Sequence, residues 1–157
     1  MTIPQSAKRS NNSGQTMVET ALIIFFLVLM IFGMTEFGRA MYTKNTLTSA
    51  ARAGARVAVV TPASSYPTLS ATSVNCSSTP ANAIYAAVCT GIAGGGIQNR
   101  TVTVTVNIND PSGATQSAPA TGYSVTLTVQ ANFTPVLNLM RNMISSTLSG
   151  QATMRYE

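Results

Sequence analysis

The stretch that decides the fold is SGQTMVETALIIFFLVLMIFGMTEFG, residues 13–38. Within it, Glu19 and Glu36 enclose the uncharged residues 20–35. A helix over those residues spans about 24 Å, which is less than the roughly 30 Å hydrocarbon core of a bilayer. If this helix crosses a membrane, Glu19 therefore lies at or inside the apolar layer.

A carboxylate in that position is energetically unfavourable. Insertion into the middle of a membrane costs an acid roughly 2.5 to 3.5 kcal/mol, and less near the edge. An intramembrane acid is therefore a functional candidate by default. The alternative is that Glu19 lies among the lipid headgroups and has no role, and the residues alone leave both interpretations open.

The composition excludes several function classes. Only 8 % of the 157 residues are charged, against roughly 25 % in ordinary soluble domains. The net charge of +5 comes from scattered Lys and Arg, so we expect no nucleic-acid partner. The chain has no His, which excludes Ser-His and Cys-His couples. We expect no enzyme activity, no metal site and no cofactor, and this argues against a membrane-anchored secreted enzyme.

The two cysteines set the orientation of the chain. Basic residues flank the apolar run on both sides, so the positive-inside rule is equivocal. Cys76 and Cys89 both follow the run, in a Ser/Thr/Pro-rich region. A disulfide is their expected use, and it requires an oxidising compartment. We therefore expect a cytoplasmic N-terminus and a head region on the other side of the membrane.

Gly14 precedes the apolar run and follows a short polar leader that contains Lys8 and Arg9. An ordinary secretory signal has its cleavage site after the apolar stretch instead. Cleavage between Gly14 and Gln15 leaves the apolar helix on the mature protein, with Glu19 as its fifth residue. This arrangement resembles the signal of type IV pilins and pseudopilins. The resemblance implies that Glu19 meets the freed N-terminal amine of a neighbouring subunit.

The residues after the run extend this resemblance. Gly33, Glu36, Phe37 and Gly38, followed by AARAGAR at 50–56, are similar to the TadE-like pseudopilin family over roughly residues 14–60. The resemblance implies a prepilin-like structural subunit, a minor pilin or pseudopilin. By this resemblance we expect the subunit to be cut by a prepilin peptidase, extracted by an inner-membrane assembly platform, and built into a Tad-type type IV pilus or a related secretion filament.

The implied partners are the membrane and other pilin subunits, in a homo- or hetero-oligomeric filament. The implied location is the bacterial inner membrane with the head in the periplasm, and the extracellular pilus after assembly. The alternative function is an uncut single-span protein whose extracytoplasmic head binds a partner.

The helix is expected to continue beyond the membrane, from about Gln15 to Val60, until Pro62 stops it. One face of its second half has helical spacing and almost only small side chains. Such a face packs closely, either against the protein's own head or against neighbouring helices. Its residues are Leu47, Ala50, Ala51, Gly54, Ala55 and Ala58.

The head region has weaker signals. We expect a loop over 64–79, and a short helix over 80–92 that starts at Thr79-Pro80 and stops at the glycines 94–96. Alternation of Val and Thr predicts strands over 102–108 and 123–133, joined by an exposed connection over 110–122. A short amphipathic helix over 135–148 and a last strand over 152–156 complete the predicted antiparallel sheet.

The predicted fold class is therefore α+β: a long pilin-like N-terminal helix followed by a small head with an antiparallel sheet and short helices. The expected organisation is a cytoplasmic leader over 1–14, a helix over 15–60 whose transmembrane part is about 18–35, and a periplasmic or extracellular head over 61–157.

Overall fold

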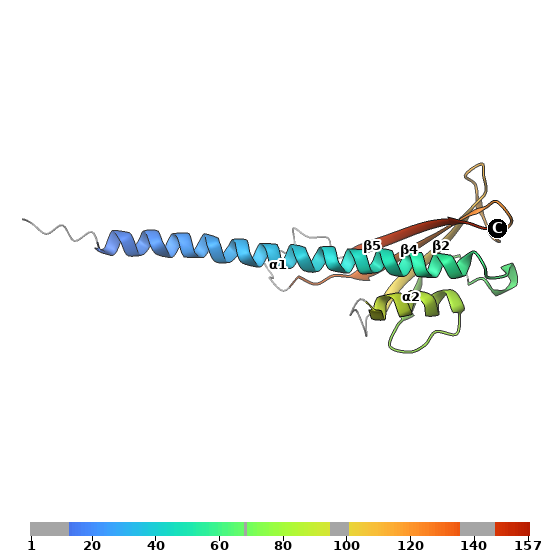
Figure 1. Cartoon of the computed structure of the whole chain (residues 1–157), viewed down its shortest axis with the longest axis horizontal. Coiled ribbons are helices and arrows are strands. Elements are labelled where there is room, and N and C mark those ends of the chain that lie inside the picture. Colours follow the sequence, from blue (N-terminus) through green and yellow to red (C-terminus); the bar gives the residue numbers. More distant parts are fainter. Residues whose placement is uncertain (1–12, 68, 95–100, 136–146) are drawn as a thin grey trace, which may run out of the picture. The chain divides into compact units, whose positions relative to one another are not determined.

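The structure is a computed structural model that describes residues 13–67, 69–94, 101–135 and 147–157. It confirms the α+β class (Figure 1). Its contacts divide the chain into a first unit that ends at Phe37 and a second unit, Gly38–Glu157. In chain order the elements are α1 (Ser13–Ala58), the 3-10 helix η1 (Ala63–Ser65), β1 (Thr72–Asn75), α2 (Ala83–Gly94), β2 (Thr101–Asn109), β3 (Thr115–Gln116), β4 (Ser124–Asn132) and β5 (Thr147–Arg155).

The second unit contains one antiparallel sheet with the strand order β1-β2-β4-β5, and the short β3 pairs with the end of β2. The predicted alternation holds in β2, where the Val and Ile side chains are fully buried and the Thr side chains between them are not. In the ladder, Val104 lies opposite Val129, and Leu127 lies opposite Ala152. The sheet therefore has one apolar face and one polar face.

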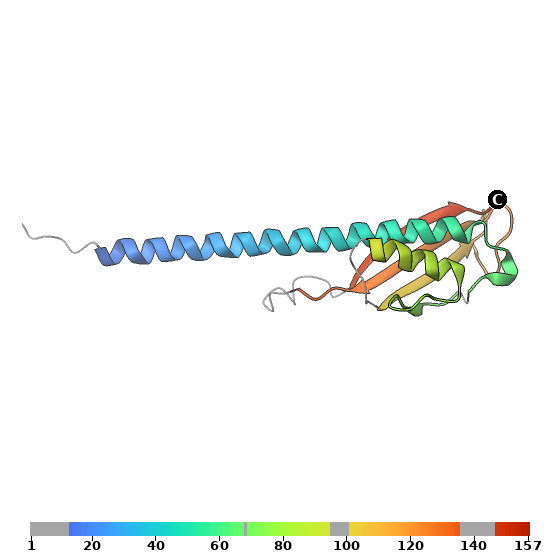
Figure 2. The same ribbon diagram turned by 60° about the horizontal axis from the view of Figure 1, so that its bottom comes forward.

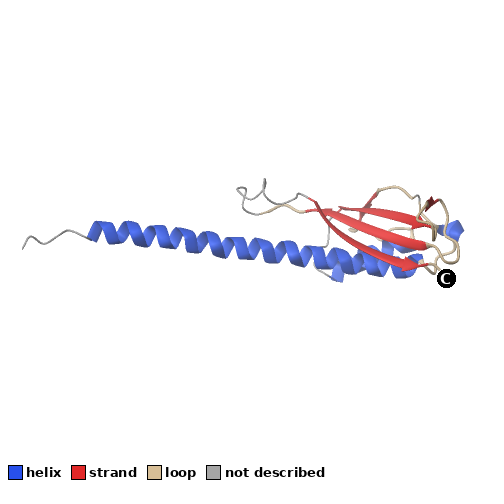
Figure 3. Ribbon diagram, turned by 90° about the horizontal axis from the view of Figure 1, so that it is seen from above, coloured by secondary structure: helices blue, strands red, loops and turns tan. Residues whose placement is uncertain are grey.

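Both helices cover the apolar face, and the second half of α1 lies beside α2 (Figures 2 and 3). Ile84, Val88 and Ile92 of α2 are fully buried in the core. The six predicted small-face residues of α1 also lie in this core, where each is buried. This half of α1 therefore packs against the protein's own second unit.

Three glycines allow this close packing. A Cβ on Gly54 of α1 would lie 2.6 Å from side-chain atoms of Leu127 and Val88. A Cβ on Gly91 of α2 would lie 2.7 Å from the Cα of Ala50. On Gly150 of β5, it would overlap the α1 backbone at Leu47 and Thr48. The helix backbones and the strand therefore approach to distances that any side chain would prevent.

The predicted start of the second helix was wrong. Helix α2 begins at Ala83, and Asn82 is its cap: the Asn82 Oδ1 atom accepts a hydrogen bond from the Ile84 backbone N–H at 2.9 Å. Asn is among the best N-cap residues, so it prevails over the Thr79-Pro80 pair upstream. The helix ends at Gly94 as predicted, and the other two glycines of 94–96 lie outside the described residues.

Four further boundaries differ from the sequence prediction. The last strand, predicted over 152–156, begins earlier, since β5 spans Thr147–Arg155. The expected loop over 64–79 contains η1 and strand β1, and the expected connection over 110–122 contains β3. Most of the predicted helix over 135–148 lies outside the described residues. Its last residue, Leu148, belongs to β5, because the ladder pairs it with Ala131 of β4. At β1, β3 and β5, cross-strand pairing overrides the local pattern.

We predict that Gly150→Ala destabilises the second unit by about 1 to 3 kcal/mol or more, because the new methyl group has to push β5 away from the α1 backbone. Thermal unfolding of the full chain in detergent measures this, with Ser149→Ala, an exposed position of the same strand, as the control. Equal melting temperatures for Gly150→Ala and the wild type would contradict the close approach.

Candidate assembly site

The sequence-predicted processing and assembly residues lie in the first turns of α1. Gly14, Gln15 and Glu19 are all helical and all exposed. Gln15 and Glu19 are four residues apart, so they lie on the same side of the helix, one turn after another. The structure thus places the Gly14–Gln15 bond next to the face that carries the Glu19 carboxylate.

The rest of the first unit is a surface of large apolar side chains. Their exposed fractions run from 42 % for Val28 to 75 % for Met17. Such a surface is stable only against lipid or against other apolar surfaces. The exposed residues are Met17, Val18, Leu22, Ile23, Ile24, Phe25, Phe26, Leu27, Val28, Leu29, Met30, Ile31, Phe32, Met34 and Phe37.

By length and composition, one helix in the described part of the chain can cross a membrane. This segment is Gly14–Ala58, and the most apolar stretch of 18 residues in it has a mean hydropathy of 2.5. The same stretch has no buried residues. The predicted span over 18–35 lies inside this helix, and its position in a bilayer stays a prediction.

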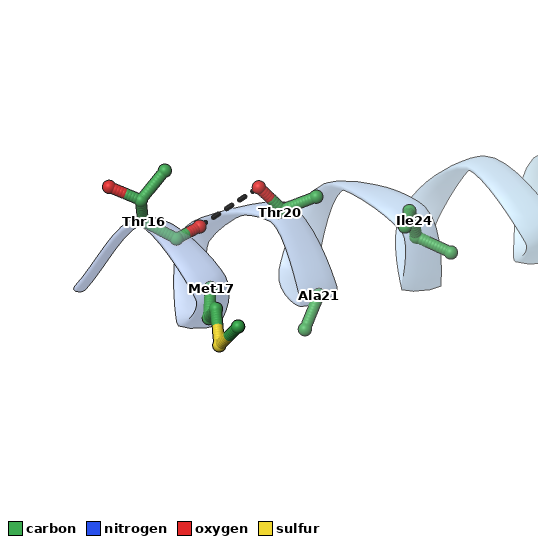
Figure 4. Close-up of a pocket in the computed structure, with 5 residues that line it drawn as sticks. All are labelled: Thr16, Met17, Thr20, Ala21 and Ile24. Carbon is green, nitrogen blue, oxygen red and sulfur yellow. Dashed lines mark hydrogen bonds between the residues drawn. The ribbon is translucent and has the colours of Figure 1, made fainter. Parts of the chain in front are cut away.

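A shallow groove runs along another side of the helix, lined by Thr16, Met17, Thr20, Ala21 and Ile24 (Figure 4). The Thr20 hydroxyl donates a hydrogen bond to the Thr16 carbonyl oxygen at 2.9 Å. Hydroxyl groups satisfied inside their own helix add little polarity to the surface. At 3.6 residues per turn, Glu19 lies roughly 130° around the helix from the centre of this groove.

The first unit therefore offers a neighbour two different surfaces. One side presents a carboxylate among apolar residues, and another presents a shallow groove lined by two Thr, one Ala, Met17 and Ile24. An acid in apolar surroundings attracts a positively charged group, because pairing compensates for its lost hydration. The chemistry available here is charge pairing and apolar packing.

The predicted disulfide between Cys76 and Cys89 is present, with a Cα–Cα distance of 5.1 Å. It links the residue after β1 to the middle of α2. The bond closes a loop of about fourteen residues, which the chain-entropy model values at roughly 3 kcal/mol. Its role in this structure is to stabilise the second unit.

We predict that Cys76→Ser lowers the free energy of unfolding of the second unit by roughly 3 kcal/mol, because the unfolded chain gains conformational freedom. Denaturant unfolding of the full chain measures the change, and Ser77→Ala is the matched control. A reducing agent should bring the wild type to the stability of the variant and leave Cys76→Ser unchanged. Resistance of the wild type to reduction would argue against this role.

Sequence reasoning missed the hydroxyl groups that cap the end of α1. The Tyr66 hydroxyl donates to the Ala58 carbonyl oxygen at 2.6 Å, and the Tyr156 hydroxyl donates to the Thr61 carbonyl oxygen at 3.1 Å. The Thr61 hydroxyl donates to the Val57 carbonyl oxygen at 2.7 Å. The carbonyl groups of Val57 and Ala58 also accept backbone N–H bonds from Val60 and Thr61. The hydroxyl groups therefore add a second bond to each of these two carbonyl groups, and Tyr156 bonds the chain just beyond the helix. Burial, and then the nearby Tyr156, raise the pKa of Tyr66 to about 12.

The raised pKa of Tyr66 predicts that the stability of the folded chain depends on pH. Tyr66 is neutral in the folded chain, and its pKa of about 12 lies above the ordinary value of 10.0. Its contribution to stability is therefore complete below about pH 10 and is lost as the pH rises from about 10 to 12. We predict that Tyr66→Phe reduces this loss and lowers stability at about pH 9 by roughly 0.5 to 1.5 kcal/mol.

Unfolding of the full chain at several pH values between about 9 and 12 tests this prediction. The control is Tyr85→Phe on α2, whose hydroxyl takes no part in the three bonds at the end of α1. An identical alkaline profile for Tyr66→Phe and the wild type would count against the hydroxyl cap.

Asp110, one of the four acids of the chain, has a local structural role. Its Oδ1 atom accepts hydrogen bonds from the backbone N–H groups of Ser112 and Ala114, both at 2.9 Å, and from the Ser112 hydroxyl at 2.6 Å. Gln116 donates to Oδ2 at 3.1 Å. The Ser112 hydroxyl contributes most to lowering the Asp110 pKa, and the bonds from Ala114, Gln116 and the Ser112 backbone lower it further. The carboxylate thus holds the turn between β2 and β3.

Within the described ranges, no group of three or more His, Cys, Asp or Glu residues could hold a metal ion.

Residues 14–56 match the family model described as TadE-like protein. The match confirms the resemblance seen in the sequence, and it covers Gly14, Gln15 and Glu19 as well as most of the small-residue face of α1. No curated protein and no solved structure matches the chain.

Proposed function

We propose that this chain, which its TadE-like segment marks as a pilin-like protein associated with a Tad pilus, is a structural subunit cleaved by a prepilin peptidase. Cleavage separates Gly14 from Gln15, and the mature subunit then enters a Tad-type filament or a related secretion filament. One observation carries the proposal. Glu19 is the single charged side chain on the apolar surface between residues 16 and 35, and it lies in the segment that matches the family.

Cleavage explains why a charge in this place is useful. It creates a positively charged amine on Gln15, one helical turn before Glu19 on the same side of the helix. When a second subunit lies alongside with a small axial offset, its amine reaches the carboxylate of the first. Both groups are then removed from water together. Removing one partner from such a buried pair costs roughly 3 to 5 kcal/mol.

The exposed apolar side chains support the same proposal. Before assembly, the surface from Met17 to Phe37 is suited to the acyl chains of the membrane. After extraction, the same surface is suited to the equivalent helices of neighbours, because packing in both environments depends on apolar contact. A subunit that moves from a membrane into a filament needs a helix that is stable in both.

The proposed organisation follows from these steps. Residues 1–14 are the cytoplasmic leader, 18–35 are the membrane span, and residues from about 61 onward lie in the periplasm or outside the cell, where the Cys76–Cys89 bond is stable. The partners are the prepilin peptidase, the assembly platform of the inner membrane, and other pilin subunits.

We predict that Glu19→Ala leaves membrane insertion and folding intact but reduces incorporation into filaments. In the bilayer the substitution removes a costly acid, so insertion is unchanged or improved. In the filament it leaves an amine without its partner, and a loss of about 3 kcal/mol or more corresponds to roughly a hundredfold lower incorporation. Cell fractionation followed by quantification of the chain in sheared filaments measures both effects.

Thr35→Ala is the matched control, because it removes an exposed polar side chain of the same helix, outside the groove, without changing the charge. It should incorporate like the wild type. Wild-type incorporation of Glu19→Ala would favour the alternative in which Glu19 lies among headgroups without a role. Mature protein that retains residues 1–14 would favour the uncut single-span binding protein.

A further inference from the structure

The outer edge of β5 is a hydrogen-bonding surface that the described residues leave open. Strand β5 pairs with β4 on one side, and no described strand lies on its other side. The Tyr156 backbone N–H donates to Tyr123 O, and Tyr156 O accepts from Gly122 N–H, so the backbone groups of Tyr156 face the β4 side. Because these directions alternate along a strand, the backbone groups of Ser149, Gln151 and Thr153 face outward.

This edge lacks the features that usually prevent strands from joining. It is nine residues long, and it contains no Pro, no Lys and no acid. Its one charge is Arg155, at the very end. Natural proteins commonly protect exposed edges with such residues, because an open edge is a template for another strand. A long edge without them is suited to receive a strand.

The direction of β5 decides which strand it can receive. Gly150 faces Leu47 of α1, and the Tyr156 hydroxyl binds the Thr61 carbonyl group just beyond the end of α1. The distance along the strand from Gly150 to Tyr156 and the distance along the helix from Leu47 to Thr61 are both about 20 Å. Strand β5 therefore runs in the same direction as the second half of α1, as the ribbon also shows (Figure 1).

We propose that the outer edge of β5 binds the β1 edge of a second copy that has the same orientation, so that the two sheets become one. This inference rests on the proposed function, because subunits of one filament or one membrane have parallel α1 helices. When two such copies lie side by side, the β5 edge of one can meet only the β1 edge of the next. A symmetric antiparallel β5-to-β5 pair would reverse one α1 relative to the other, and a symmetric parallel pair would place the helices of the two copies on opposite faces of the sheet.

The strand order makes the two edges compatible. The path β1-β2-β4-β5 contains four strands, and each neighbouring pair is antiparallel. Strands β1 and β5 therefore run in opposite directions within one copy. A β1 from a neighbour with the same orientation then forms an antiparallel ladder with β5. The contact joins two different edges, so it can repeat along an open assembly.

The width of the two helices is compatible with a repeat of one sheet width per copy. Four strands occupy a width of about 19 Å, and two adjacent helices at their usual spacing occupy roughly 16 to 20 Å. Helices α1 and α2 touch at Gly91 and Ala50 and cover the apolar face side by side (Figure 2). A second copy can thus continue the sheet without forcing its helices into those of the first.

Cysteine cross-linking of the full chain tests the pairing. Ser73 of β1 and Gln151 of β5 are both exposed. They lie on the polar face, since Ser73 is opposite Thr103 and Gln151 is opposite Thr128. Copies that carry Ser73→Cys are coexpressed with copies that carry Gln151→Cys, and mild oxidation is followed by non-reducing gel analysis of membranes and filaments. We expect a dimer when both variants are present and little dimer with either alone.

A second variant tests whether the contact depends on backbone hydrogen bonds of β5. Gln151→Pro removes an outward N–H and leaves the bonds to β4 in place, so it should abolish a cross-link between Ser73→Cys and Thr153→Cys or Ser149→Cys. Gln151→Ala, which keeps the N–H group, should retain it. The intact Cys76–Cys89 bond and an unchanged melting temperature show that each variant is folded.

The outcomes separate this inference from the proposed function. A dimer of Gln151→Cys with itself, or no dimer in any combination, overturns the pairing. If the wild-type chain is still cleaved after Gly14 and its incorporation still depends on Glu19, the proposed function survives that result. A dimer between Ser73→Cys and Gln151→Cys in membranes, with no cleavage, supports the pairing and argues against the filament role.

Discussion

The rest of the structure depends on one constraint: a single continuous helix, α1, has to present two different surfaces in succession. Up to Phe37 it carries large, exposed apolar side chains, and from Leu47 to Ala58 it carries a small-residue face that is buried. The first surface is suited to lipid and to other helices, which require apolar contact area. The second lets a strand and another helix approach the helix backbone closely. The change in side-chain size along one helix therefore separates the part that exposes apolar surface from the part that organises the protein's own fold.

The architecture of the second unit follows from the small-residue half of α1. Because Gly54, Gly91 and Gly150 have no side chains, α2 and β5 can both contact the same helix. The hydroxyl groups of Tyr66 and Tyr156 then bond carbonyl groups at or just beyond the end of this helix and join it to η1 and to the chain end. The disulfide fixes β1 against α2 at the other side of the sheet. The second unit thus has two packed layers, one of helices and one of strands. The polar face of the sheet is on the side away from the helices.

Much of this was predictable from local patterns. The alternation in 102–108 and 123–133 predicted β2 and β4, because one buried face imposes a period of two. Helical spacing predicted the small face of α1, although the residues alone left open what it packs against. Strand β1 was missed because four residues of a Ser/Thr-rich segment form a strand only through pairing with β2. The Tyr156 cap was missed because Thr61 and Tyr156 are 95 residues apart, and no local signal connects them. The Tyr66 cap is local, but it depends on how the chain folds back after Pro62. Glu19 was identifiable because an acid stands out against an uncharged run.

The most direct test of the account is the identity of the first residue of the mature wild-type chain. The chain should be purified from the envelope of cells that contain a prepilin peptidase, and its N-terminal peptide sequenced by mass spectrometry. We expect that the mature chain begins at Gln15, and that Gly14→Leu leaves a membrane-retained precursor that still carries residues 1–14. A wild-type chain that begins at Met1 or Thr2, in cells where other prepilins are cleaved, would contradict it.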